Sequence, residues 1–91
     1  MIEIRVTPRF KRNYQKWIKK HPDLKEKLWE RIEQFSKNPF EPTLKTHSLK
    51  NILEGLWAFS ITYEYRLVFE FLNSEKTIVA FVDIGSHDEV Y

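Results

Sequence analysis

The sequence predicts an α+β fold of β-α-α-β-β-β order, in which a two-helix hairpin packs on one face of an antiparallel sheet. Three observations indicate this fold. Apolar residues alternate as in strands near both ends of the chain, they recur with helical spacing between residues 8 and 37, and the last three strands are joined by short turns. The length of 91 residues suits a single domain, 1–91, with one modest core.

The first predicted strand and the first predicted helix meet at a proline. Within residues 1–7 the apolar side chains are Ile2, Ile4 and Val6, and polar residues stand between them. Pro8 ends this strand and suits the first turn of a helix over 8–20. The apolar residues of that helix recur at i, i+4, i+7 and i+8, namely at Phe10, Tyr14, Trp17 and Ile18.

A second helix follows the break at His21-Pro22. Its apolar stripe consists of Leu24, Leu28, Ile32 and Phe35. Asn38-Pro39 ends this helix and opens a connector over about 38–54, which carries Lys45, His47 and Lys50. His21 is interpreted as a residue of the helix junction, held extended by the proline that follows it.

Three strands complete the predicted fold, over 56–63, 65–72 and 77–84. The first carries Trp57, Phe59, Ile61 and Tyr63 on one side, and the second carries Tyr65, Leu67, Phe69 and Phe71. Short turns predict that the three strands form an antiparallel meander. The helices are expected to cover its apolar face and to leave the other face for function.

Charge is distributed unevenly along the chain. Residues 1–50 hold 13 Lys and Arg against 6 Asp and Glu, whereas residues 51–91 hold 2 against 7. Six cations and no acid lie between residues 9 and 20: Arg9, Lys11, Arg12, Lys16, Lys19 and Lys20. This cluster suits a polyanion, and the alternative is a solvated helix face.

Several classes of protein are disfavoured by composition. The chain has no cysteine, which excludes disulfides, thiolate catalysis and cysteine-based zinc sites. The three histidines lack zinc-site spacing, and two glycines cannot make a glycine-rich phosphate loop, so we expect no metal and no cofactor. The sequence has neither a signal-peptide pattern nor a membrane-span pattern, so we expect a soluble, cytoplasmic protein.

The final segment, 84–91, is the strongest candidate for a site. A turn at Gly85-Ser86 would lift His87 off the end of the last strand, and histidine is suited to give and take a proton near neutrality. The alternative is a frayed polar terminus.

Arg66 is the second candidate, because it lies within a strand and is expected to project from the open face. There its guanidinium would match a phosphate. The alternative is a cross-strand pair with Glu70 or Asp83.

Taken in order, the whole chain resembles toxins of the RelE/ParE superfamily, and in particular the RelE/YoeB/YafQ-type messenger RNA interferases. Three stretches carry the resemblance: 44–50, then 55–57 with 64–69, and finally 84–91. The resemblance implies the toxin of a type II toxin-antitoxin system. Such a toxin enters the A site of the 70S ribosome, cleaves mRNA without a metal, and is silenced by a cognate antitoxin.

The resemblance also implies roles for individual residues. His87 matches the C-terminal catalytic histidine of YafQ-like and YoeB-like members, and His47 matches the connector histidine of YafQ-like members. Arg66 matches the strand arginine of RelE and YoeB that contacts the scissile phosphate, and Tyr91 matches a terminal aromatic residue that stacks on a base. Ser60 departs from the YafQ-like pattern, which has a histidine there.

These matches lead to a hypothesis for the site. His47 and His87 form an acid and base pair in an undecided order, Arg66 stabilises charge, and Tyr91 orients the base or phosphate. Lys45 and Lys50 clamp the RNA backbone, and the basic helix contributes Arg9, Arg12 and Lys16. The hypothesis requires His47, Arg66 and His87 to meet in one exposed hollow. Two alternatives are a ParE-like inhibitor of DNA gyrase and a non-catalytic RNA-binding or ribosome-binding domain.

Overall fold

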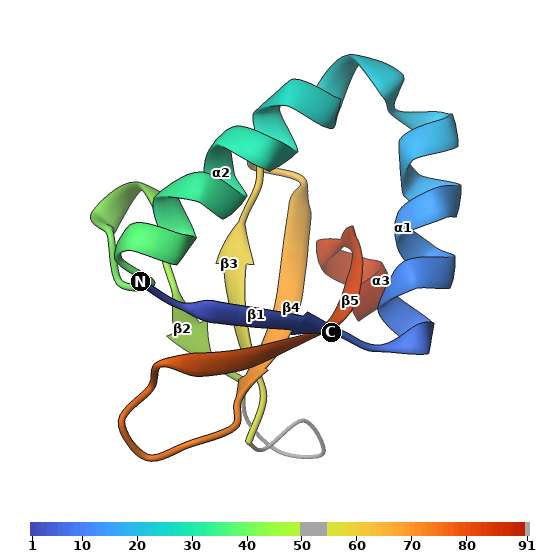
Figure 1. The fold of residues 1–91 in the computed structure, drawn as a ribbon. Coiled ribbons are helices and arrows are strands. Elements are labelled where there is room, and N and C mark those ends of the chain that lie inside the picture. The colour runs from blue at the N-terminus through green and yellow to red at the C-terminus, as the bar shows by residue number, and fades with distance from the viewer. Residues whose placement is uncertain (50–54, 91) are drawn as a thin grey trace.

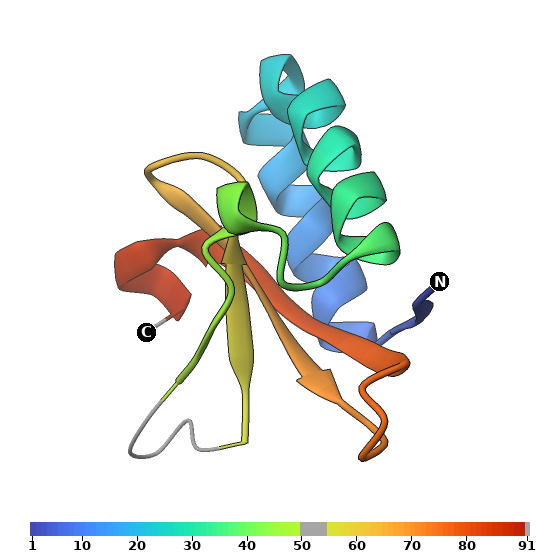
Figure 2. The same ribbon diagram turned by 90° about the vertical axis from the view of Figure 1, so that its left-hand side faces the viewer.

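Five strands of the described chain form one sheet in the order β1-β5-β4-β3-β2. The computed structural model describes residues 1–49 and 55–90. The strands are β1 (Glu3–Val6), β2 (His47–Ser48), β3 (Trp57–Ser60), β4 (Tyr65–Phe71) and β5 (Ile78–Ser86). The helices are α1 (Pro8–Lys20), α2 (Lys25–Lys37) and the short α3 (His87–Val90). Figure 2 shows α1 and α2 on one side of the sheet and α3 on the other.

The two long helices form as the sequence predicts. The Thr7 hydroxyl caps α1 by accepting a hydrogen bond from the Phe10 amide at 3.1 Å, and Pro8 occupies the first turn. A 3-10 turn over Pro22–Leu24 separates α1 from α2, so that α2 begins at Lys25 and ends one residue before Asn38. The helices thus form the predicted hairpin, which is seen above and beside the sheet in Figure 1.

The α+β architecture and the meander of β3, β4 and β5 are confirmed, and two details of the sheet differ from the prediction. β1 pairs with β5 in parallel, from Glu3 opposite Ile78 to Val6 opposite Phe81, so the sheet is mixed. Short turns fix the direction of neighbouring strands in sequence, but β1 has no such neighbour in the sheet. A fifth strand, β2, lies within the predicted connector and pairs with β3.

The main core lies between the helical hairpin and the sheet. It is built on aromatic side chains, with the Phe35 ring of α2 centred 4.8 Å from Phe59 and 4.7 Å from Phe69. The predicted alternation in β3 and β4 is therefore confirmed for these strands. Tyr63 is an exception at 89 % exposed, because β3 ends at Ser60 and the chain bends before β4 begins.

The opposite face of the sheet is not left open, contrary to expectation. A second, smaller apolar cluster covers it, made of Leu49, Ala58, Val68 and Val90. Val90 belongs to α3, so this cluster attaches the end of the described chain to the sheet. Across the described residues, no helix has the length and apolar character needed to cross a membrane.

Candidate functional site

A hollow of about 460 Å³ opens where β4 begins and β5 ends. Its described lining consists of Tyr63, Glu64, Arg66, Ser86, His87 and Asp88. The antiparallel pairing of β4 and β5 creates it, because Tyr65 lies opposite Ser86 and Arg66 lies opposite Gly85. Two of the predicted catalytic residues, Arg66 and His87, therefore share one exposed cavity.

Backbone carbonyls, rather than a carboxylate, hold the Arg66 guanidinium. Its Nη1 donates to the carbonyl oxygens of Thr62 at 2.8 Å, Tyr63 at 2.8 Å and Tyr65 at 3.2 Å. The alternative pairing with Glu70 or Asp83 is wrong, and within residues 1–49 and 55–90 Arg66 forms no ion pair. The strand-loop backbone thus orients the guanidinium without neutralising its charge.

His87 is the first residue of α3 and directly follows Ser86, the last residue of β5. Its amide donates to the Glu64 carbonyl at 3.0 Å, which links α3 to the bend before β4. The imidazole is 57 % exposed, and its Nδ1 lies 3.8 Å from Oδ1 of Asp88. That carboxylate is itself fully exposed, so the pair adds little stability. The β5 strand continues through Ser86, so His87 follows the strand directly rather than a turn at Gly85-Ser86.

His47 lies on β2 and points its ring toward its own connector. Its Nδ1 is 2.9 Å from the carbonyl oxygen of Lys45. A carbonyl oxygen only accepts, so Nδ1 carries hydrogen and the neutral ring has its lone pair on Nε2. Lys45 has a left-handed backbone, with φ of 52°, which shapes this loop.

The hollow contains two of the three side chains that were expected to meet there. His47 pairs with Ala58, whereas Arg66 pairs with Ser60, two residues further along β3. His47 and Arg66 lie on the same face of the sheet, because their partners Ala58 and Ser60 are residues i and i+2 of β3 and share a face. The two Cα atoms are separated by two inter-strand spacings across the sheet and by two residues along β3, which together put them roughly 12 Å apart. The second apolar cluster lies on this same face.

The predicted RNA-binding residues have different surroundings. Lys45 is exposed beside His47, and Arg12 and Lys16 are exposed on α1. Lys50 and Tyr91 lie outside the described residues, so their predicted roles stay predictions.

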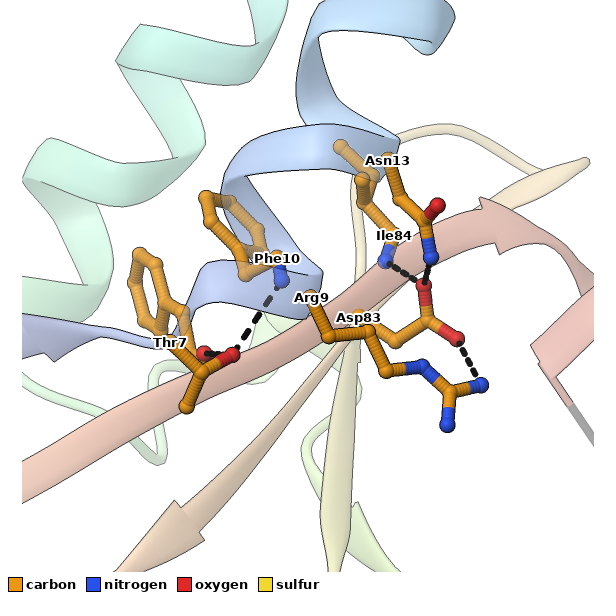
Figure 3. A network of polar contacts seen from close by, with 7 residues as sticks. Thr7, Arg9, Phe10, Asn13, Asp83 and Ile84 are labelled. Atoms are coloured by element: carbon orange, nitrogen blue, oxygen red, sulfur yellow. Dashed lines mark hydrogen bonds and ion pairs between the residues drawn. The ribbon is translucent and has the colours of Figure 1, made fainter.

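Arg9 is engaged with a buried acid on β5. Its Nη2 lies 3.0 Å from Oδ2 of Asp83, and the other carboxylate oxygen accepts from Asn13 at 2.6 Å and from the Ile84 amide at 2.8 Å (Figure 3). Asp83 is only 7 % exposed and lies beside the point where the register of β4 against β5 shifts. Sequence reasoning missed this network, although an acid within an apolar strand was a visible signal.

No group of three potential metal ligands gathers anywhere in the described part of the chain. His21 contacts aromatic rings instead, with its ring 5.3 Å from Trp17 and 4.5 Å from Tyr65. These contacts tie the end of α1 to the start of β4, which agrees with the interpretation of His21 as a junction residue.

The five-stranded sheet with a helical hairpin on one face is the fold of the YafQ and YoeB toxins. A family model described as "Bacterial toxin of type II toxin-antitoxin system, YafQ" matches residues 2–91. The chain therefore belongs to the YafQ toxin family, as the resemblance in its sequence predicted. Comparison with curated proteins found no match.

Solved structures support the same fold. YafQ from E. coli strain BL21(DE3) has a TM-score of 0.80 and 18% identity, over 100% of this chain and 99% of that one. A metal-bound toxin from Helicobacter pylori has a TM-score of 0.78 and 23% identity, over 100% of both chains. The heterotetrameric YoeB-YefM toxin-antitoxin complex from Staphylococcus aureus has a TM-score of 0.71 and 20% identity, over 96% of this chain and 98% of that one.

Proposed function

We propose that this toxin is a ribosome-dependent endoribonuclease that cleaves mRNA in the A site. The observation that carries the proposal is the exposed hollow in which Arg66 and His87 lie together. Arg66 pairs with no carboxylate among the described residues and lies beside an exposed imidazole, and such a guanidinium is suited to a phosphate that gains charge during the reaction. We further propose that the protein acts in the cytoplasm, where it meets the 70S ribosome.

The chemistry needs a base, an acid and a cation. The base removes the 2′-hydroxyl proton, the 2′-oxygen attacks the adjacent phosphorus, and the acid protonates the departing 5′-oxygen. Arg66 would stabilise the added charge on phosphorus through the guanidinium nitrogens that do not bind carbonyls. His47 and His87 would supply the base and acid, in either order.

The separation of His47 from the hollow sets a condition on this mechanism. Because the two Cα atoms are roughly 12 Å apart, His47 and Arg66 would contact the scissile nucleotide from opposite sides. The nucleotide would therefore lie over the second apolar cluster, which covers the sheet between His47 and Arg66. Tyr91, Lys45 and Lys50 would complete this surface as base-stacking and backbone-binding groups.

An antitoxin is the proposed protein partner. The family is defined by type II toxin-antitoxin systems, and the structurally similar S. aureus YoeB was solved as a toxin-antitoxin complex with YefM. An antitoxin that binds this chain would block access of RNA or of the ribosome to the site.

The test is cleavage of message on translating ribosomes, mapped by primer extension. The wild-type protein should give cuts at A-site codons, and His87→Ala should lower the cleavage rate by about 10²–10⁴-fold if His87 transfers a proton. Glu70→Gln is the control, since Glu70 is an exposed residue of β4 outside the described lining of the hollow, and this variant should cleave near the wild-type rate. A fully active His87→Ala variant would remove His87 from the mechanism. Gyrase-linked DNA damage without cuts would favour the ParE-like alternative.

A further inference from the structure

A second hollow, of about 290 Å³, lies between α1 and the end of β5. α1 contributes Arg9, Asn13, Lys16 and Lys20, and β5 contributes the facing segment 83–85. The four α1 residues are spaced by three or four positions, so they lie along one flank of the helix. Part of the positive charge of the predicted basic helix therefore lines the hollow between α1 and the sheet.

Two of these cations, Lys16 and Lys20, have no acidic partner among the described residues. Asp83 is the acid of the described lining, and Arg9, Asn13 and the Ile84 amide already bind it. Within the described residues, neither Lys16 nor Lys20 forms an ion pair. With Arg9 offsetting Asp83, the described lining carries a net charge of +2.

The second hollow adjoins the hollow of Arg66 and His87. Gly85 lines the second hollow and pairs with Arg66 on β4, whereas Ser86 and His87, the next two residues, line the first. The last residues of β5 thus separate the two cavities. A strand of RNA with one phosphate at Arg66 would meet Lys16 and Lys20 after crossing this segment.

We propose that the hollow of Lys16 and Lys20 binds a backbone phosphate of RNA that flanks the cleavage site. The inference rests on the proposed function for its choice of RNA as the ligand. Lysine ammonium groups bind phosphate as point charges, and the ion pair with Arg9 offsets the Asp83 carboxylate that would otherwise repel a phosphate.

An acidic peptide is the competing ligand, and the structure favours it less. Peptide segments gain most of their affinity from buried apolar anchors. On α1, the apolar groove is formed by its other flank, where Phe10 and Tyr14 lie with Trp29. The apolar residues that line the Lys16 and Lys20 hollow, Trp17, Ile84 and Val90, are buried, so they leave little apolar surface for a peptide to anchor on.

Two double variants with equal changes of charge test the proposal. Lys16→Gln with Lys20→Gln removes both cations of the hollow, and Lys11→Gln with Lys19→Gln is the control on the same helix. Glutamine and lysine have similar helix propensities, so both variants should fold. The probes are a short 2′-O-methyl oligoribonucleotide, which cannot be cleaved, and purified small ribosomal subunits without message.

Binding is measured over a range of salt concentrations. Loss of one phosphate contact should weaken binding by roughly tenfold and should reduce the salt slope of log K by about 0.7 for a single strand. The control should lose less affinity on the same probe. A selective loss on the oligonucleotide would support a phosphate of the message, and a loss confined to ribosomal subunits would overturn that assignment in favour of ribosomal RNA.

Equal binding by the two double variants on both probes would overturn the proposal. Binding of both double variants to the cognate antitoxin is measured in parallel, and a selective loss confined to the antitoxin would also overturn the proposal, in favour of an acidic peptide. Failure of the nuclease proposal would give a different result. The wild-type protein would leave message intact on ribosomes, while the two double variants would still differ in their affinity for RNA.

Discussion

The two faces of the sheet are covered in different ways, and the difference separates stability from function. On one face, α1 and α2 seal an aromatic core that includes Phe35, Phe59 and Phe69. On the other face, a four-residue helix holds a small cluster of Leu49, Ala58, Val68 and Val90. Arg66 and His87 lie at the edge of this thinner cover. The sealed face therefore holds the larger part of the buried core, and the thinly covered face borders the hollow of Arg66 and His87.

The largest effect is expected from a substitution in the aromatic core of the sealed face. Phe35→Ala removes a fully buried ring that contacts Phe59 and Phe69, so the free energy of unfolding should fall by about 3–5 kcal/mol. Urea unfolding measures the change, and Phe40→Ala, at a half-exposed ring, is the control and should cost far less. Cleavage by any Phe35→Ala protein that stays folded should be near normal. A loss of only about 1 kcal/mol would mean that the aromatic core does not dominate folding.

Arg66→Lys should show the opposite pattern on the thinly covered face. Lysine keeps the charge but cannot bind three carbonyls and a phosphate with one planar group, so cleavage should fall by about 10²–10³-fold. The free energy of unfolding should change by about 1 kcal/mol, because the lost hydrogen bonds are partly exposed. Primer extension on ribosomes measures the first effect and urea unfolding the second. Arg5→Lys, at an exposed arginine paired with Glu3, is the control and should leave both quantities unchanged. Cleavage at the wild-type rate would exclude Arg66 from the chemistry.

The sealed face was also the more predictable of the two. The periodicity of residues 8–20, together with the Thr7-Pro8 start, predicted α1 with the bounds that it has. The short turns between β3, β4 and β5 likewise predicted which strands pair. Sequence spacing alone was enough for these features, because each depends on residues close together in the chain.

The site was predictable only in part, because its geometry depends on distant pairings. Arg66 and His87 meet through the local pairing of β4 with β5, which the sequence indicated. The place of His47 depends on the register of β2 against β3, and a two-residue strand shows no alternation from which that register could be inferred. The parallel pairing of β1 with β5 is equally non-local.

Val90→Ala gives the smallest expected effect and tests whether the thin cover positions His87. The substitution trims a buried contact between α3 and the sheet, so the free energy of unfolding should fall by about 1 kcal/mol. Because α3 begins at His87, a looser helix should misplace the imidazole and lower cleavage by roughly tenfold. Val82→Ala is the matched control, since Val82 packs against the same cluster from β5 and not from α3. It should cost similar stability and leave cleavage near normal. If both variants lowered cleavage equally, the cluster would support the sheet as a whole, and the position of His87 would depend on its amide bond to Glu64 rather than on α3.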